Sequence, residues 1–230
     1  MVKTSLVVLT KWSALTENKD SIVKLYDYFR STAAYRLRIA LLYKGLDYQS
    51  IPIHLVNNGG EQHGKEYRAI NPQELIPSLT DGSHTLTQSL AILEYLEEKY
   101  PSPPLLPEDI VQRAHARSIA QMVVCDIHPL NNLRVLQYLT KTLEHSEEEK
   151  LSWYRHWVAL GFSAIEARLQ DMSRNKPVCV GDSISLADIC LIPQVYNAHR
   201  FGCPMDAYPL INAINEHCLG LDAFYKSAPE

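Results

Sequence analysis

Alternating apolar and polar positions mark two segments near the start of the chain. Residues 22–29 and 48–55 alternate in this way, which predicts two β-strands. The amphipathic run between them predicts a helix, because Ser31 or Thr32 can cap its N-terminus and a glycine directly after Lys44 can end it. The three segments form a β-α-β unit with hydroxyl side chains at the start of the helix.

The α/β pattern continues to about residue 100. A polar loop with one short helix, at 56–70, precedes two short strands that we expect on either side of the turn Asp81-Gly82. An amphipathic helix then begins near Ser89. The order β-α-β followed by β-β-α predicts a small α/β domain.

The pattern becomes helical after a proline-rich linker at 101–109. Four prolines within seven residues cannot continue a helix there. Beyond the linker, helical spacing of apolar residues predicts helices at 112–142, 147–171, 186–198 and 208–218. We therefore expect three parts: an N-terminal extension at 1–21 that fits no regular element, an α/β domain at 22–104, and an all-α domain at 108–230.

Composition and charge narrow the class of protein. Hydrophobic residues make up 46% and charged residues 21% of the 230, as in an ordinary soluble globular protein. The net charge of −4 argues against a general nucleic-acid binder. The five cysteines are scattered and form no Cys-x-x-Cys pair, which argues against a disulfide framework or a zinc site. No apolar run is long enough to span a membrane, and we expect a cytoplasmic protein without a metal.

Two predicted helix N-termini are candidates for ligand binding. Ser31 and Thr32 stand at one and Gln88-Ser89 at the other. Both pairs can be plain caps, but unpaired N–H groups and the helix dipole also suit a ligand with two negative ends. Ile76-Pro77 is either an ordinary trans turn or a cis bond that turns the backbone of Ile76 toward a peptide ligand. The segment around Ser31 has no Cys, His or acidic residue, so a nucleophile there would come from the ligand.

Five motifs carry a resemblance to a known family. In chain order they are YFRSTAAYRLRIAL, NPQELIPSL, QSLAILEYLEE, CDIHPLNNLRVLQYL and GDSISLADICLIPQVYNAHRF. From residue 22 onward the chain resembles the glutathione transferases, and most closely the zeta class of maleylacetoacetate and maleylpyruvate isomerases. The resemblance implies an α/β thioredoxin-like N-terminal domain, an all-α C-terminal domain, glutathione as the cofactor, and a homodimer.

The same resemblance implies a set of site residues. Ser31 and Thr32 are the expected catalytic hydroxyls, which hold the thiol of glutathione, and Ala33 stands where the class usually has a cysteine. Further glutathione contacts are expected at Arg36, Gln62, Ile76, Gln88, Ser89, His128, Asn132 and Arg134. Arg30 and Arg200 are expected to bind the substrate.

Structural roles are the alternatives for some of these side chains. His128, before a proline, can be a helix-end packing residue, and Arg200 can simply complete the C-terminal end of a helix dipole. Arg36 and Arg38 are two positions apart in a helix, so we expect one to point inward and the other to solvent.

The implied activity is the glutathione-dependent cis–trans isomerisation of a small acidic unsaturated diketo acid such as maleylacetoacetate. Isomerisation of maleylpyruvate and general glutathione transfer are alternative activities. A transferase-fold interaction protein without catalysis is a further alternative, and glutathione affinity discriminates against it, because such a protein does not need the tripeptide.

Overall fold

A four-stranded mixed sheet forms the first layer of the computed structural model, which describes residues 22–172 and 175–229. The predicted extension at 1–21 lies outside the described residues. The strand order is β2-β1-β3-β4, with β1 parallel to β2 and antiparallel to β3, and β3 antiparallel to β4. The strands are β1 (Val23–Asp27), β2 (Tyr48–Pro52), β3 (Ser78–Asp81) and β4 (His84–Thr87), somewhat shorter than the sequence pattern predicts.

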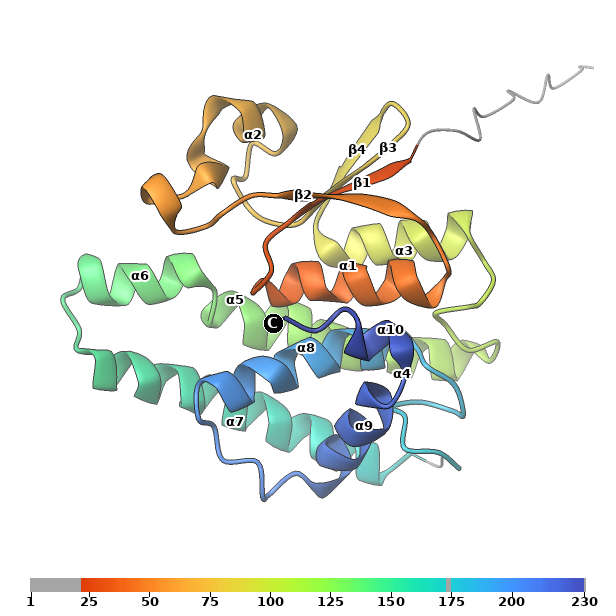
Figure 1. Ribbon diagram of the computed structural model, residues 1–230. Helices are drawn as coiled ribbons and strands as arrows, with labels where there is room; N and C mark the ends of the chain where they lie inside the picture. Colours follow the sequence, from red (N-terminus) through yellow and green to blue (C-terminus); the bar gives the residue numbers. More distant parts are fainter. Residues whose placement is uncertain (1–21, 173–174, 230) are drawn as a thin grey trace, which may run out of the picture.

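Helices flank this sheet in the thioredoxin-like arrangement that the resemblance implies. The helices α1 (Thr32–Tyr43) and α3 (Ser89–Lys99) lie side by side against it, between the sheet and the helical half (Figure 1). Between β2 and β3 the chain forms two 3-10 turns and a short helix, which stand apart from α1 and α3 across the sheet in Figure 1. These are η1 (Asn57–Gly59), η2 (Glu61–His63) and α2 (Lys65–Ile70).

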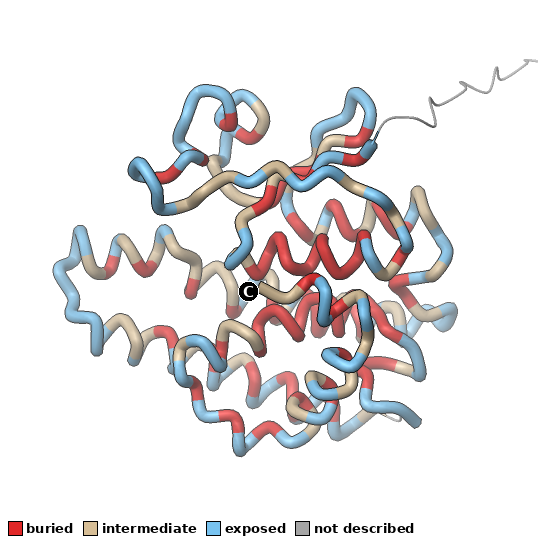
Figure 2. The backbone as a smooth tube through the Cα atoms, viewed as in Figure 1, coloured by how far each residue is buried: buried red, intermediate tan, exposed pale blue. Residues whose placement is uncertain are grey.

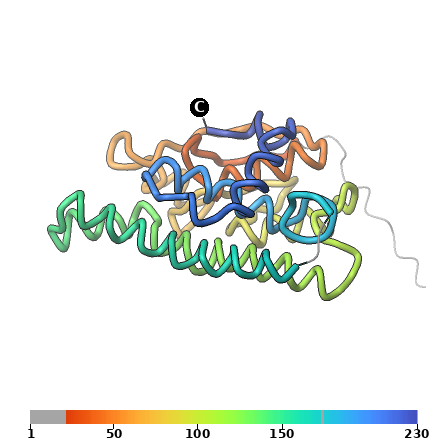
Figure 3. The backbone as a smooth tube through the Cα atoms, turned by 90° about the horizontal axis from the view of Figure 1, so that it is seen from below, coloured from red at the N-terminus to blue at the C-terminus, as the bar shows by residue number. Residues whose placement is uncertain are grey.

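The second half of the chain is entirely helical in its regular elements. Its longest helix, α7, runs along nearly the whole helical half (Figure 3). No helix in the described part of the chain combines the length and apolar character that a bilayer span requires. The elements are α4 (Ile110–Gln121), the π-helical turn η3 (Met122–Ile127), α5 (His128–Leu130), α6 (Leu133–Lys141), α7 (Glu147–Gln170), α8 (Leu186–Arg200), α9 (Pro209–Leu219) and α10 (Asp222–Tyr225).

The single helix predicted at 112–142 is wrong, because the chain breaks there into four elements. Pro129 lacks the N–H that a continuous helix needs, and Asn132 leaves the helical conformation to cap α6. The Oδ1 atom of Asn132 accepts a hydrogen bond from the Arg134 N–H at 3.2 Å. His128, at the start of α5 and before this break, lies with its Nδ1 3.2 Å from the hydroxyl of Thr32 at the start of α1.

Helix α1 is buried on nearly all sides, as Figure 2 shows by the run of buried residues along it. It packs against α3, α8 and α10 as well as facing the sheet, so it has almost no solvent-facing side. The expectation that Arg36 and Arg38 divide between interior and solvent is therefore wrong: they are only 1% and 8% exposed. Each must find polar partners inside the protein.

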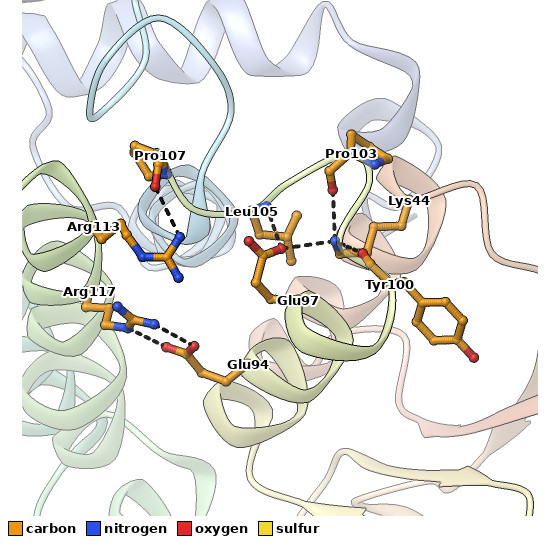
Figure 4. Close-up of polar contacts among 9 residues, drawn as sticks. All are labelled: Lys44, Glu94, Glu97, Tyr100, Pro103, Leu105, Pro107, Arg113 and Arg117. Atoms are coloured by element: carbon orange, nitrogen blue, oxygen red, sulfur yellow. Dashed lines mark hydrogen bonds and ion pairs between the residues drawn. The ribbon is translucent and has the colours of Figure 1, made fainter. Parts of the chain in front are cut away.

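A buried polar cluster ties the linker to the first half of the chain (Figure 4). The ammonium group of Lys44 lies 3.1 Å from the Glu97 carboxylate and donates to the carbonyls of Tyr100 at 2.6 Å and Pro103 at 2.8 Å. The same Glu97 oxygen accepts from the Leu105 N–H at 2.7 Å. The linker is thus held by one buried ion pair at the C-terminal ends of α1 and α3.

A second contact joins the two halves directly, and Figure 4 shows it next to the first. Arg117 of α4 donates two hydrogen bonds to Glu94 of α3, at 2.8 and 3.0 Å. Arg113, one turn earlier on α4, donates to the Pro107 carbonyl at 3.2 Å. Arg117 thus connects α4 to α3, and Arg113 connects α4 to the linker.

Candidate functional site

The turn between β1 and α1 presents a serine hydroxyl. The Ser31 N–H donates to the Tyr28 carbonyl at 2.8 Å, and the Ser31 Oγ atom accepts from the Ala34 N–H at 3.2 Å. Ser31 is therefore the N-cap of α1, and Thr32 is its first helical residue. Because Oγ serves the cap with a lone pair, its own proton remains available to a ligand.

Thr32 faces the second half of the chain. Its hydroxyl lies 3.2 Å from Nδ1 of His128, which α5 brings to the start of α1. Burial, together with the positive charges of Arg36 and Arg134, lowers the pKa of His128 to about 3. The imidazole is consequently neutral near pH 7, with one nitrogen that donates and one that accepts. This contact places His128 beside the hydroxyl of Thr32, so the side chain does more than pack at the end of a helix.

The N-terminus of α3 has a buried cation behind it. Nη1 of Arg36 donates to Ser89 Oγ at 3.1 Å, while Nε and Nη2 of Arg36 have no partner among the described residues. Burial lowers the pKa of this guanidinium, since no carboxylate offsets its desolvation. Ser89 accepts from Arg36, so the hydroxyl proton of Ser89 points elsewhere. The arrangement fits an anion at this helix end.

Gln88 and Ile76 line the same region. Gln88 has a positive φ of 68° and its amide donates to Gln73 Oε1 at 2.7 Å. The bond between Ile76 and Pro77 is cis and not an ordinary trans turn. The carbonyl of the preceding residue, Leu75, accepts from the side chains of Tyr67 and Asn71, each at 2.7 Å.

Gln62 closes the other end of the site, on η2. It is 7% exposed, and its Nε2 lies 3.0 Å from Nε2 of His63. Its Oε1 atom is buried without a partner in the described structure. Gly60 has a φ of +104°, and a Cβ atom there would lie 2.6 to 2.9 Å from the Gln62 amide. Only glycine therefore leaves room for this side chain.

Two adjoining cavities, of about 310 and 150 Å³, lie between the halves of the chain. They share the side chains of Ile76, His128, Asn132 and Arg134, so they form one site. The structure brings all the predicted site residues to its walls: Arg30, Ser31, Thr32, Arg36, Gln62, Ile76, Gln88, Ser89, His128, Asn132, Arg134 and Arg200.

Sequence reasoning missed several polar residues of these walls, among them Gln73 and Asn197. Gln73 lines both cavities, and Asn197 lines the larger one with its Oδ1 atom buried and unpartnered in the described structure. Asn197 stands one helical turn before Arg200, which was the available signal, because residues three apart share a helix face. Gln73 is held by Gln88 across the fold, and local sequence carries no sign of that contact.

Positive charge dominates the larger cavity. Arg30, Arg134 and Arg200 line it, and within the described residues none of them forms an ion pair. The Arg30 guanidinium stacks on Phe29 at 5.0 Å and that of Arg200 on Phe201 at 5.1 Å. Three unpaired cations in one cavity suit a ligand with more than one carboxylate.

The cavity walls supply hydrogen-bond donors and cations but no protein thiol. Ala33 lines the smaller cavity, and none of the five cysteines lines either one. In the described ranges, no group of three or more His, Cys, Asp or Glu side chains is placed to hold a metal ion. A thiol nucleophile for chemistry here would enter with a ligand.

Comparison with known proteins gives consistent results. A family model described as "Glutathione S-transferase, N-terminal domain" matches residues 25–104. The chain is 50% identical to a probable maleylacetoacetate isomerase of Vibrio cholerae, over 90% of this chain and 95% of that protein.

Two solved structures are similar over nearly their whole length. One is a holo structure of a zeta-class maleyl pyruvate isomerase, with a TM-score of 0.87 and 44% identity over 90% of this chain and 96% of that one. The other is a maleylacetoacetate isomerase of Methylobacterium extorquens AM1 with bound malonate and glutathione. Its TM-score is 0.86 and its identity 42%, again over 90% of this chain and 96% of that one.

Proposed function

The chain belongs to the zeta-class glutathione transferase family, and from this premise we propose that it is a glutathione-dependent cis–trans isomerase of maleylacetoacetate. The observation that carries the proposal is the composition of the cavity: helix N-termini, hydroxyl donors and three unpaired cations, with no thiol of the protein's own. Glutathione supplies the missing thiol. Its sulfur adds to the cis double bond, the resulting single bond rotates, and the thiol leaves again to give the trans isomer.

Ser31 is the proposed donor to the sulfur. A free thiol has a pKa near 8.5, and lowering it by about two units requires roughly 2.7 kcal/mol of preferential binding to the thiolate. One hydrogen bond to a charged acceptor contributes about 1.5–3 kcal/mol, and the N-terminus of α1 adds up to about 1 kcal/mol. The hydroxyl proton that the cap leaves free is therefore sufficient, and no general base is needed.

The smaller cavity fits the γ-glutamyl end of glutathione. Ser89 and Gln88 offer donors at the N-terminus of α3, and Arg36 supplies a cation directly behind them, with two nitrogens that have no partner. A carboxylate at this point offsets the desolvated guanidinium. We assign the backbone of Ile76 to the cysteinyl unit, because the wall of both cavities includes it.

The remaining glutathione contacts come from both halves of the chain. Gln62 brings a buried amide whose Oε1 lacks a partner, which suits an N–H of the tripeptide. His128, Thr32, Asn132 and Arg134 face it from the region between the cavities. Neutral His128 fixes the Thr32 hydroxyl without adding a charge close to the sulfur.

Arg30 and Arg200 are the proposed substrate residues. Each guanidinium can hold a carboxylate through two parallel hydrogen bonds. They also stabilise the negative charge that develops on a substrate oxygen when its double bond is attacked. Their stacking on Phe29 and Phe201 fixes both groups before the substrate arrives.

One assay tests the proposal. The purified protein is mixed with maleylacetoacetate, with and without glutathione, and loss of the cis isomer is followed. We expect isomerisation only with glutathione. Maleylpyruvate, run in parallel, tests the alternative substrate that the similarity to a maleyl pyruvate isomerase supports. A chain that binds no glutathione would be the non-catalytic interaction protein instead.

We further propose a symmetric homodimer in the cytoplasm. A two-fold dimer is the commonest closed assembly, and all five cysteines are free, as a reducing compartment would keep them. Light scattering at micromolar concentration should report twice the chain mass; a particle of 26.1 kDa would contradict the dimer. Cell fractionation tests the location.

A further inference from the structure

Arg38 joins three separate parts of the chain. Its Nη1 pairs with the Asp27 carboxylate at 2.7 Å, its Nη2 donates to the Phe29 carbonyl at 3.1 Å, and its Nε donates to the Ser227 carbonyl at 3.0 Å. The side chain is only 10% exposed. All three nitrogens are used, so the plane of the guanidinium is set by the end of β1, the turn after it, and the C-terminal tail.

One of these contacts, to the Phe29 carbonyl, lies in the turn that presents the proposed catalytic hydroxyl, and the contact with Asp27 holds the strand end directly before that turn. The turn is closed by the hydrogen bond from Ser31 N–H to the Tyr28 carbonyl at 2.8 Å, and Phe29 lies inside it. The ring of Phe29 carries the Arg30 guanidinium at 5.0 Å. A shift of the Phe29 carbonyl therefore moves both the hydroxyl of Ser31 and the cation of Arg30.

The third contact comes from the far end of the sequence. Figure 1 shows the C-terminal tail lying beside the start of α1, and Figure 2 shows buried residues in both segments. Ser227 is 2% exposed, and α10 packs on α1. The Tyr35 hydroxyl donates to the Phe224 carbonyl at 3.0 Å, a second buried bond between α1 and the tail that does not reach the turn.

We propose that Arg38 is a positioning residue. It connects the C-terminal tail to the Ser31 turn, keeps that turn in place, and so sets the ionisation of the bound glutathione thiol. The inference rests on the proposed function of Ser31. Without the Ser227 carbonyl, the buried Nε–H loses its acceptor, and the guanidinium turns to find another. The Phe29 carbonyl then loses its donor, and the Ser31 proton no longer points at the sulfur.

Two variants test the coupling. Arg38→Lys keeps the positive charge but cannot hold three acceptors in one plane. A chain that ends after Tyr225 keeps Arg38 and removes its tail acceptor, the Ser227 carbonyl, together with the rest of residues 226–230. The matched control is Tyr35→Phe, which removes one buried hydrogen bond between α1 and the tail and leaves Arg38 intact.

The primary measurement is the thiol pKa of bound glutathione, from the ultraviolet absorbance of the thiolate as a function of pH. In both test variants we expect a rise of about one unit, which means roughly tenfold less thiolate near neutral pH. The acid limb of the kcat/KM profile should move by the same amount, and activity should recover at alkaline pH. Tyr35→Phe should lower the melting temperature and leave the thiol pKa unchanged.

The outcomes separate the two proposals. A wild-type protein that binds glutathione with a thiol near its free pKa would overturn both the role of Ser31 and that of Arg38. A lowered thiol pKa in the wild type that persists in the truncated chain would overturn the role of Arg38 alone. If Arg38→Lys does not fold, the truncated chain still decides, because it retains the buried ion pair with Asp27.

Discussion

Replacing Ser31 removes one observed and one proposed interaction of the same oxygen. Oγ accepts from the Ala34 N–H at 3.2 Å, and its proton is the proposed donor to the glutathione sulfur. Loss of an N-cap destabilises a protein by about 1 kcal/mol. In a domain of this size that corresponds to a melting temperature lower by roughly 2–4 °C. Ser31→Ala should show this decrease in a thermal denaturation experiment.

The kinetic effect of Ser31→Ala should be larger than its effect on folding. A hydrogen bond to a charged acceptor contributes about 1.5–3 kcal/mol, which corresponds to a ten- to hundredfold loss of rate. The loss acts through the thiolate, so the acid limb of kcat/KM should shift by one to two pH units upward. At high pH, where the thiol ionises unaided, the variant should approach the wild-type rate.

Two further variants at this position separate capping from catalysis. Ser31→Gly should lower the stability of the protein by only a few tenths of a kcal/mol. Its activity should nevertheless fall as far as that of Ser31→Ala. Ser31→Asp keeps a good cap and sets a negative charge beside the sulfur, so it should fold normally and lose the most activity. If activity across the three variants instead follows their melting temperatures, Ser31 is a cap and nothing more.

Three other substitutions test separate parts of the structure. Arg200→Lys should leave glutathione binding unchanged and lower kcat/KM for the maleyl acid by ten- to a hundredfold, because Lys cannot bind a carboxylate through two parallel hydrogen bonds; an unchanged value would remove Arg200 from the site. Lys44→Met leaves the Glu97 carboxylate buried without its cation and should destabilise the fold by about 3–5 kcal/mol in urea denaturation, with partial recovery in the double variant that also replaces Glu97 by Met. His128 has a folded pKa of about 3, below that of an unfolded histidine, so the unfolded chain takes up the proton first as pH falls. The stability linked to His128 is therefore complete above about pH 6.5 and declines toward pH 3; His128→Gln should flatten this part of a stability–pH curve, and an unchanged slope would contradict the lowered pKa.

The sequence was sufficient for elements whose signals are local. The cap at Ser31, the strands around Asp81-Gly82 and the proline-rich linker all appear where the residue types predict them. Helix 112–142 was wrong because apolar spacing continues across Pro129 and Asn132, while the backbone does not. The spacing of apolar residues indicates which positions face the core. It does not indicate where a side chain takes the place of a backbone hydrogen bond and ends the helix.

The environment of α1 could not be predicted, because it depends on segments distant in sequence. Helical spacing predicts one of Arg36 and Arg38 in solvent, but the tail around Ser227, 189 residues further on, contacts Arg38 and helps to bury it. Gln73 likewise reaches the cavity only through contacts made by the folded chain. Motif resemblance found the predicted wall residues because a family pattern already contains such tertiary information.

Two buried arginines on one helix are difficult to explain by stability. A buried ion pair is often no more stable than well-packed apolar residues of the same volume, and a buried cation without a carboxylate is less favourable still. Arg36 is a buried cation without a carboxylate partner, whereas Arg38 forms a buried ion pair with Asp27. Arg36 reaches the N-terminus of α3, and Arg38 reaches back to the turn at the N-terminus of α1. One rigid helix thus links the two proposed anion-binding points of the site, and only Arg36 depends on an anionic ligand to offset its desolvation, because Arg38 already has the Asp27 carboxylate.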